Sequence, residues 1–288
     1  MKKFFKVCMI LALVFVLIGL CAIGISAAFG ASWGTFYSAL RQGDFSINLY
    51  NYSDDYTDND EYEAEDTEDS SDALYTFSEI QVPDELKVDI NRGSIQIMET
   101  SKDEVYIEVT KGDKNNVRVG RDDGTLTIES KSRLRQSTEI LLYLPEDTTL
   151  SKADIEIGGG EARIDTLNVG ELDVEVGAGS LQADGVITAD ESDWSVGAGE
   201  IILAHLDSTD SRFECGVGSI EVEMAGKKSD YSWSVKSGIG SVTLGDSVIG
   251  GIGGEASDHD SSLSRKIEAE CGIGEIEISF LEQEDSHE

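Results

Sequence analysis

Proline is nearly missing from this sequence of 288 residues, which contains only Pro83 and Pro145. A proline has no backbone N–H to donate and therefore interrupts a ladder of paired strands. Its absence after residue 145 suits a long, uninterrupted series of hydrogen-bonded strands. Since no segment after residue 40 shows a helical period either, we expect an all-β fold.

Basic residues are also few, because 22 Lys and Arg stand against 57 Asp and Glu and leave a formal net charge of −35. A nucleic-acid-binding protein needs basic patches to neutralise phosphates, and adsorption to an anionic lipid surface needs them as well. The composition therefore argues against nucleic acid as a partner and favours partners that are neutral or basic.

Histidine and cysteine, the usual ligands of transition metals, are rare: the chain has three histidines, at positions 205, 259 and 287, and four cysteines. None of the histidines stands at ligand spacing from a cysteine. Neither D-x-[DN]-x-[DN]-G nor a repeated G-G-x-G-x-D nonapeptide is present, and no G-x-S-x-G turn occurs in the sequence from residue 76 on. We therefore predict no metal, no cofactor and no catalytic residue.

Long apolar runs are absent except for Val7–Ile25, which has 19 residues without a polar side chain. At about 1.5 Å per residue, a helix of this length spans most of a hydrocarbon core of about 30 Å. Lys2, Lys3 and Lys6 precede it and acidic sequence follows it, so the positive-inside rule predicts a cytoplasmic N-terminus and an exported remainder. We expect a single-pass protein of the cytoplasmic membrane whose β-domain lies outside.

A cleaved signal peptide is the alternative, because Ser26-Ala27-Ala28 offers small residues for cleavage. The apolar run is longer than the roughly 7–15 residues of most signal-peptide cores, which favours an uncleaved anchor. Both interpretations export the rest of the chain.

The sequence divides into five segments by composition. Residues 1–34 form the tail and anchor, and residues 35–75 include eleven acidic side chains between Asp54 and Asp72 with no basic one. Such a stretch repels itself and buries no core, so it predicts a disordered, extended acidic stalk. The remaining segments are an N-terminal β section at 76–150, a glycine-cornered β-repeat section at 151–281 and an acidic tail at 282–288.

Glycine pairs recur through the repeat section, as in "DVEVGAGSLQAD" and "AECGIGEIEI". Aligned on the second glycine, the copies stand at 160, 179, 199, 218, 240 and 274, and most steps are 19 to 22 residues. A period of about twenty residues is typical of a stacked repeat architecture. A dinucleotide site uses one G-x-G-x-x-G before a helix, whereas strand-like alternation follows each pair here, so we predict no nucleotide. The turn glycines are Gly93 (from a weaker upstream copy), Gly158, Gly160, Gly177, Gly179, Gly197, Gly199, Gly216, Gly218, Gly238, Gly240, Gly272 and Gly274.

Apolar residues alternate on both sides of each glycine pair, but the alternation changes phase across it. Val176 and Leu181 are both expected in the core although they are five positions apart, an odd number. A glycine corner or bulge supplies this slip in register. We therefore predict a parallel β-solenoid, similar to a β-helix, with rungs of about 20 residues. A β-sandwich is the alternative, because alternation alone does not fix strand direction.

The period breaks once, between Gly240 and Gly274, where the step is 34 residues. The excess is rich in glycine and serine and includes His259 between two aspartates. We interpret residues 245–266 as a surface loop that projects from the stack. Because it alone interrupts the repeat, it is the candidate contact site for a partner.

Cys215 and Cys271 each stand immediately before a glycine pair. If the rungs stack in chain order, the copy that contains Ser237 separates the two cysteines by two layers, about 10 Å. A disulfide needs a Cα separation below about 7 Å. We therefore predict two buried free thiols that pack as small hydrophobic side chains.

The strand section ending "LLYLPEDTTL", the recurrent "G.GS[IL].[VA]" copies and the N-terminal apolar run resemble the bacterial putative-adhesin domain family over roughly residues 78–280. That family is a domain of unknown function with β-solenoid repeats, similar to proteins of the Lia envelope-stress system. The resemblance implies adhesion or association with the cell envelope, and it provides no active-site residues to transfer.

Two functions stay open at this point. The one we favour is a non-enzymatic, membrane-anchored envelope protein whose extracytoplasmic β-solenoid binds an envelope protein or a cell-wall component, in adhesion or in envelope-stress support. The alternative is a polysaccharide-active β-helix enzyme that uses paired carboxylates. The glutamates beside the turns recur with the repeat, as a solvent-facing row does, which favours binding over catalysis.

Overall fold

Alternation of buried and exposed side chains runs through the strands of the described part of the chain. That part comprises residues 60–61, 65–66, 74–131 and 137–281 of a computed structural model. The predicted transmembrane segment Val7–Ile25, most of the acidic stalk and the tail 282–288 lie outside it. Among the described residues, no helix is long and apolar enough to cross a membrane.

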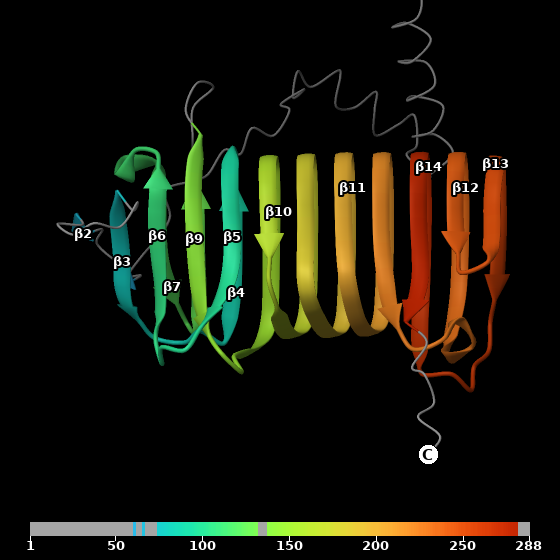
Figure 1. The fold of residues 1–288 in the computed structure, drawn as a ribbon, viewed down its shortest axis with the longest axis horizontal. Helices are drawn as coiled ribbons and strands as arrows, with labels where there is room; N and C mark the ends of the chain where they lie inside the picture. The colour runs from blue at the N-terminus through green and yellow to red at the C-terminus, as the bar shows by residue number, and fades with distance from the viewer. Residues whose placement is uncertain (1–59, 62–64, 67–73, 132–136, 282–288) are drawn as a thin grey trace, which may run out of the picture. The chain divides into compact units, whose positions relative to one another are not determined.

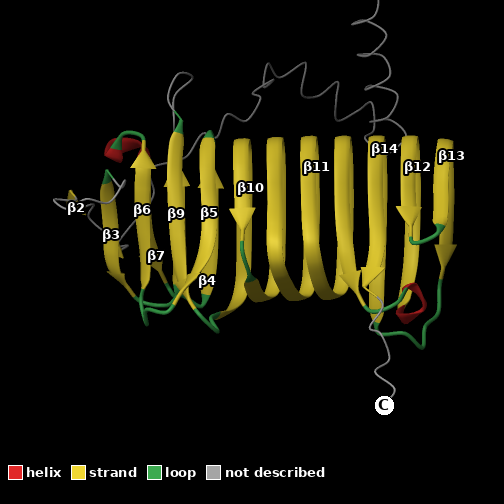
Figure 2. Ribbon diagram, in the orientation of Figure 1, coloured by secondary structure: helices red, strands yellow, loops and turns green. Residues whose placement is uncertain are grey.

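The described residues are all-β, and their fourteen strands join in one sheet that folds back on itself (Figures 1 and 2). Helical turns in this part of the chain are limited to the short 3₁₀ segments Lys114–Asn116 and Lys228–Asp230. The strands are β1 (Asp60–Glu61), β2 (Glu65–Asp66), β3 (Tyr75–Ile80), β4 (Glu85–Ile90), β5 (Gly93–Thr100), β6 (Val105–Lys111), β7 (Val117–Asp122), β8 (Thr125–Ser130), β9 (Thr138–Pro145), β10 (Thr149–Ile164), β11 (Leu167–Ala225), β12 (Tyr231–Leu244), β13 (Ser247–Asp258) and β14 (Arg265–Leu281).

Parallel pairing between neighbouring rungs forms the middle of the stack. β10 pairs in parallel with the first turn of β11, so that Ile157 lies beside Val176 and Gly160 beside Gly179. On its other side β10 pairs with β4 and β5, which places Gly93 beside Gly160. β11 then continues as one strand of 59 residues that coils along the stack (Figure 1). The repeat therefore builds parallel rungs, as in a β-solenoid, and not a β-sandwich.

The N-terminal β section (76–150) and the β-repeat section (151–281), which composition separates, belong to the same stack. All described residues belong to one compact unit, Asp58–Glu288. β4 and β5 form a rung beside β10, and β8 and β9 form the next rung outward, parallel to them. Antiparallel strands β7 and β6 cover that end, and β3 pairs with β6.

The rungs do not follow chain order at the C-terminal end, and the expectation that they do was wrong. β14 lies between the last turn of β11 and β12, with parallel pairing on both sides. β12 and β13 form a hairpin closed by Gly245 and Asp246. Such a short turn joins only antiparallel strands. The hairpin therefore occupies the end of the stack, and the parallel copy β14 lies between β11 and the hairpin (Figure 1).

This order changes the prediction for the cysteines. Cys215 and Cys271 are direct register partners in β11 and β14, so the predicted separation by two layers is wrong. Both thiols are nevertheless buried and unbridged in the structure. Ser237 lies on the far side of Cys271, in β12.

Arg265, the first residue of β14, ties the inserted strand to both neighbours. Its guanidinium donates hydrogen bonds to the carbonyl oxygens of Ser208 at 3.0 Å and Ala225 at 3.3 Å, and it pairs with the carboxylate of Asp207. It also lies over the ring of Tyr231, 4.6 Å from the centroid. One side chain thus joins the end of β11 to the start of β12.

Residues 245–266 are not a projecting loop, contrary to the sequence prediction. Most of them form β13, which pairs with β12 from Ser247 opposite Leu244 to Asp258 opposite Trp233. The glycines that suggested a loop continue the corner of the rungs. Outside the strands, this range contains only the hairpin turn of Gly245 and Asp246 and the segment between β13 and β14.

Two dipeptides of the acidic segment belong to the sheet and not to a disordered stalk. Asp60 in β1 pairs opposite Arg121 in β7, and Glu65 in β2 pairs opposite Thr76 in β3, both antiparallel. These short strands supply backbone partners to edges that would otherwise stay open. Backbone pairing therefore holds these acidic residues in the sheet, although the composition of their segment alone predicts disorder.

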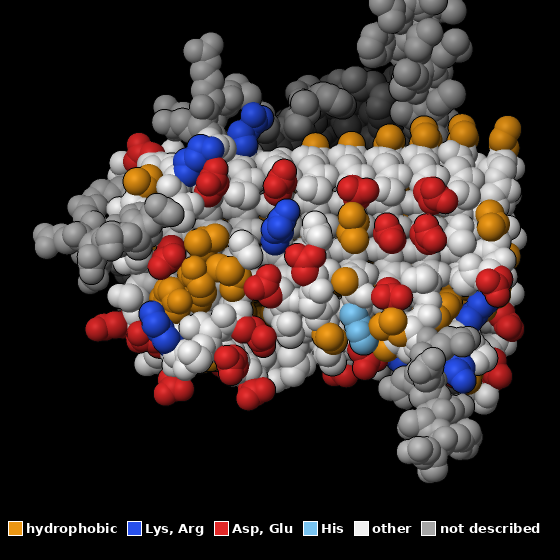
Figure 3. Space-filling view, viewed as in Figure 1, with side chains coloured by type: hydrophobic (Ala, Val, Ile, Leu, Met, Phe, Trp, Pro, Cys, Tyr) orange, Lys and Arg blue, Asp and Glu red, His pale blue; other side chains and the backbone are white. Residues whose placement is uncertain are grey.

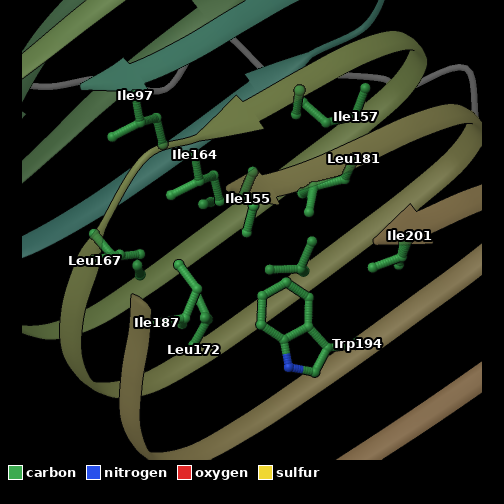
Figure 4. Close-up of a cluster of buried hydrophobic side chains, with 14 of the residues drawn as sticks. Ile97, Ile155, Ile157, Ile164, Leu167, Leu172, Leu181, Ile187, Trp194 and Ile201 are labelled. Atoms are coloured by element: carbon green, nitrogen blue, oxygen red, sulfur yellow. The ribbon is translucent and has the colours of Figure 1, made fainter. Parts of the chain in front are cut away.

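Side chains from the two sheets of the stack meet in a narrow apolar core. Figure 4 shows Ile155, Leu172 and Trp194 from strand segments before the glycine corner, with Ile164 and Leu181 from segments after it. Each of these side chains is at most 1% exposed. Burying a side chain of this size stabilises the fold by about 1.5–3 kcal/mol, and each rung achieves that burial only with its neighbours in place.

Candidate functional site

Two columns of glycine run along one edge of the stack, at the corner between the two strand segments of each rung. A Cβ atom added to Gly160 would lie 1.8 Å from the carbonyl oxygen of Gly93, and one added to Gly218 would lie 1.9 Å from that of Gly199. Gly160 and Gly218 also have φ values of +142° and +140°, which side chains rarely allow. At these corners the space in front of each glycine is filled by the backbone of the neighbouring rung, so it does not form a phosphate cradle.

The structure places the predicted turn glycines in these two columns. In stack order, the first column contains Gly158, Gly177, Gly197, Gly216, Gly272 and Gly238, and the second contains Gly93, Gly160, Gly179, Gly199, Gly218, Gly274 and Gly240.

An exposed apolar ridge follows the same edge, formed by the residue between the two glycines of each corner. Val217 lies beside Ile273, Ile273 beside Ile239, and Ile239 beside Ile252. Their exposed fractions are 52% for Val217, 38% for Ile273, 51% for Ile239 and 93% for Ile252. Figure 3 shows this row of hydrophobic side chains along the upper edge of the view. We call it the corner ridge, which in stack order consists of Gly159, Ala178, Ala198, Val217, Ile273, Ile239 and Ile252.

The corner itself explains why these side chains are exposed. The chain turns there from one sheet to the other, so a residue at the tip has no core on either side. Neighbouring rungs lie about 4.8 Å apart, which brings the branched side chains of Val217, Ile273 and Ile239 within contact range of each other. A continuous apolar strip on the surface is typical of an interaction site.

A column of alternating glutamate and serine borders the corner ridge on the sheet that follows the corner. Ser219 donates a hydrogen bond to Glu200 at 3.3 Å, and Ser241 donates one to Glu275 at 3.5 Å. Successive carboxylates stand two rungs apart, about 10 Å, and a hydroxyl lies between them, which limits their repulsion. We call this the Glu/Ser column, and in stack order it reads Glu139, Ser94, Glu161, Ser180, Glu200, Ser219, Glu275 and Ser241.

Carboxylates border the ridge on the opposite sheet as well. Glu156 lies beside Glu175, and Glu214 lies beside Glu270, in the positions that precede the corner. Lys236 follows in the same column and pairs with Glu270 at 2.6 Å. The corner ridge is therefore an apolar strip between two mainly acidic margins, which suits a surface with apolar residues bordered by Lys or Arg.

Crowding raises the pKa of two carboxyl groups on this opposite sheet. Burial, and then the nearby carboxylate of Glu129, raises the pKa of Asp89 above its ordinary value. Burial, and then the charges of Asp154 and Asp193, raises the pKa of Asp173. Asp154 is the register partner of Asp173 in the next rung, so like charges in adjoining rungs oppose ionisation.

β13 adds an open edge at the end of the corner ridge. Within the described residues β13 pairs only with β12, so its other edge has no strand partner there. Val248 and Ile252 on this strand are 71% and 93% exposed, the highest values among the large hydrophobic residues described. The contact region predicted at 245–266 thus contributes the end of the ridge, as a strand.

A second apolar patch lies around two tyrosines near the other end of the stack. The rings of Tyr106 and Tyr143 are stacked with centroids 4.2 Å apart, and Lys102 lies 3.9 Å from the centroid of Tyr106. The Tyr143 hydroxyl donates a hydrogen bond to Glu108 at 3.3 Å, and burial together with that carboxylate raises the pKa of Tyr143 to about 12. The rings are half-buried and held by contacts within the patch, so they offer less free surface than the corner ridge.

Groups suited to catalysis do not converge in the described part of the chain. No cluster of three or more His, Cys, Asp or Glu side chains there could hold a metal ion. His205 is half-buried in β11, His259 is exposed after β13, and His287 lies outside the described residues. The glutamates beside the corners occupy equivalent places in successive rungs, so their surroundings do not assign one of them a separate role as acid, base or nucleophile.

The residues of the corner ridge were overlooked in the sequence although a signal was present. The middle residue of each glycine pair changes from Gly159 through Ala178 to Val217 and Ile273. An outward position that becomes apolar along a repeat indicates a surface that is not shaped by solubility alone. The acidic margins, in contrast, depend on the stacking order, which the spacing of the glycines does not give.

Comparisons with known proteins identify one family and several solved structures. A family model described as Toastrack DUF4097 matches residues 51–270 of the chain. No curated protein matches it. A putative cell adhesion protein from Clostridium sporogenes is 17% identical, with a TM-score of 0.40 over 72% of this chain and 99% of that one. A putative adhesin from Bacteroides fragilis is 18% identical, and a putative lipid binding protein from Parabacteroides distasonis is 16% identical. Both give a TM-score of 0.37 over 70% of this chain and 95% of theirs.

Proposed function

The chain belongs to the Toastrack DUF4097 family, and from that premise we propose that it is a non-enzymatic, membrane-anchored envelope protein that binds a partner through the corner ridge. The observation that carries the proposal is the row of exposed Val217, Ile273, Ile239 and Ile252 on neighbouring rungs. Apolar side chains in a continuous strip gain free energy when a second surface removes them from water.

The charge around the ridge supports a partner of a particular chemistry. Carboxylates stand on both margins, including Glu200 and Glu275 on one side and Glu214 and Glu270 on the other. A partner surface with an apolar strip bordered by Lys or Arg complements this pattern, and an anionic surface is repelled. We therefore propose an envelope protein of that kind, in adhesion or in envelope-stress support.

The proposed location rests on the sequence before the described residues. The apolar run Val7–Ile25 with Lys2, Lys3 and Lys6 before it supports a single-pass anchor with the N-terminus in the cytoplasm. The β-solenoid then lies outside the cytoplasmic membrane, where the partner meets it.

The competing function, a polysaccharide-active enzyme, is less well supported by the carboxylates beside the corners. Glu161, Glu200 and Glu275 lie in one row on one face, about 10 Å apart. A glycosidase instead places two carboxyl groups on opposite sides of the scissile bond, about 5–9.5 Å apart. A straight row of equivalent glutamates favours a recognition surface.

Affinity capture with ridge variants tests the proposal. We expect the full-length chain in detergent to retain an envelope protein that the double variant Ile239→Ser, Ile252→Ser does not retain. Val186→Ser, at an exposed valine in the return between two rungs, is the matched control and keeps the partner. Equal retention by all three proteins would overturn the assignment of the ridge. Hydrolysis of a cell-wall glycan that is lost in Glu200→Gln would support the enzyme instead.

A further inference from the structure

The two cysteines of the described residues lie opposite each other in neighbouring rungs. Cys215 in β11 and Cys271 in β14 are register partners in a parallel pair of strands. Strands in such a pair lie about 4.8 Å apart, and the Cα atoms of a disulfide span about 4.4–6.8 Å. The neighbouring thiol of Cys271, together with burial, raises the pKa of Cys215. Both side chains are buried, so they lie next to each other on the core face of neighbouring strands.

We propose that Cys215 and Cys271 form a disulfide that fastens β14 to β11 when the protein folds under oxidising conditions. The structure, with both thiols free, then represents the reduced form. In the cell the bond rests on the proposed function, because it needs the extracytoplasmic location. The chemistry of the pair itself does not depend on a partner.

The reaction is thiol–disulfide exchange with a small-molecule or protein disulfide as the oxidant. The thiolate of one cysteine attacks the oxidant, which forms a mixed disulfide and releases one thiol. The second cysteine then attacks the sulfur of the first, which forms the Cys215–Cys271 bond and releases the second thiol. Two protons and two electrons pass from the cysteines to the oxidant, and its disulfide is reduced to two thiols.

The position of β14 gives this bond a structural purpose. β14 follows the β12–β13 hairpin in the chain, but in the stack it lies between β11 and β12, which both precede it in sequence. A bond from 215 to 271 closes a long loop that contains the whole hairpin, and long loops give the larger constraint on the unfolded chain. Ser237, the register partner of Cys271 on its other side, donates its hydroxyl to the carbonyl of Gly240 at 2.8 Å, so it leaves Cys271 to pair with Cys215.

Burial predicts when the bond forms. Cys215 and Cys271 are 3% and 2% exposed, so an oxidant reaches them during folding or when β14 detaches. Refolding in the presence of an oxidant should form the bond readily, and treatment of the folded, reduced protein should form it slowly.

The test uses the full-length chain in detergent with Cys8→Ser and Cys21→Ser, which removes the other two cysteines. The protein is refolded from urea with a mixture of reduced and oxidised glutathione, alkylated, and analysed by peptide mass spectrometry and thermal unfolding. We expect a loss of two hydrogens, a peptide cross-linked between 215 and 271, and a Tm about 8–16 °C above that of the same protein with reductant.

Two results would overturn the proposal: refolded protein with both thiols free, or protein with glutathione on one cysteine and no 215–271 bond. Cys215→Ser and Cys271→Ser are the controls, and in each the reductant should leave the Tm unchanged. Because the wild-type pair is compared with and without reductant, the test does not depend on these variants folding. Partner capture is measured separately, so failure of the bond and failure of the binding function are distinguishable.

Discussion

At the scale of single residues, two adjacent glycines of one corner have different structural requirements. A Cβ atom on Gly160 would overlap the carbonyl oxygen of Gly93, whereas one on Gly159 would lie 3.6 Å from its nearest neighbour, the carbonyl oxygen of Ala178. Ala178 and Ala198 occupy the equivalent of Gly159 in the next two rungs. Of these two adjacent residues, only Gly160 is therefore required by backbone contact.

This difference predicts the outcome of two alanine substitutions. Gly160→Ala should lower the free energy of unfolding by about 3 kcal/mol or more, because the backbones of two rungs must separate and the φ value is unfavourable for alanine. Gly159→Ala should change it by less than about 1 kcal/mol. Urea unfolding followed by circular dichroism measures both, and equal losses would contradict the assignment of the columns.

Asp89 predicts a pH dependence of stability. Because its pKa is raised in the folded state, the folded protein binds this proton more tightly than the unfolded chain does. The stabilising contribution is complete below about pH 4, the ordinary pKa of an aspartate, and is lost as the pH rises through the folded-state pKa. Asp89→Asn should therefore be more stable than the wild type at pH 7, and the difference should shrink on acidification.

Urea unfolding of both proteins between about pH 4 and pH 7 measures this difference. Asp103→Asn, at an exposed turn position, controls for the general loss of one negative charge from a strongly acidic chain. An advantage of Asp89→Asn that grows on acidification, or that equals the effect of Asp103→Asn at every pH, would contradict the local explanation.

At the scale of elements, the insertion of β14 is visible in the residues after the corner. In chain order the last three of these residues are Ser219, Ser241 and Glu275. In stack order Glu275 stands between the two serines, and glutamate and serine alternate along the whole Glu/Ser column. Alternation keeps like charges two rungs apart, which is favourable in a ladder of parallel strands.

This order predicts coupling between residues 219 and 275. Ser219→Glu should lower the free energy of unfolding by about 0.5–1 kcal/mol, because it places three carboxylates in adjoining rungs. Glu275→Ser should restore part of that loss only in the Ser219→Glu background. A double-mutant cycle by urea unfolding at low salt measures the coupling. If the two substitutions are simply additive, β14 does not lie beside β11.

The strand content and the corners were predictable from the sequence, and the ends of the stack were not. Period-two alternation and the odd spacing of Val176 and Leu181 are local patterns, so they survive in the fold. The positions of β13 and β14 depend on which strand edges are free once β12 and β13 have formed their hairpin. The spacing of the glycines does not contain that information. The ordering of Asp60 and Glu65 likewise depends on edges formed by distant strands.

The site was predictable to a similar extent. The glycines of the corner were found because their spacing repeats, but Ile252 was assigned to a loop because its neighbours are glycine and serine. The same glycines continue the corner in a paired strand, since Gly251 lies opposite Gly240. Composition therefore predicted a loop where the structure has a paired strand, and the contact of this segment with a partner stays a prediction.

At the scale of the whole molecule, the proposed orientation has a direct consequence for protease access. If Val7–Ile25 anchors the chain with its N-terminus in the cytoplasm, protease added to intact protoplasts should remove the β-solenoid. Protection of the domain, together with protection of a cytoplasmic control protein, would reverse the orientation. Release of the domain into the medium with a new N-terminus near Phe29 would instead support a cleaved signal peptide.

The binding function is tested most directly by photo-cross-linking from the corner ridge in living cells. A photoreactive amino acid replaces Ile252 or Val217 in turn, and Val186, which is exposed in the return between two rungs, serves as the comparison position. We predict that the same partner is cross-linked from Ile252 and from Val217 and is not cross-linked from Val186. A partner cross-linked from Val186 and from neither ridge position would contradict the account.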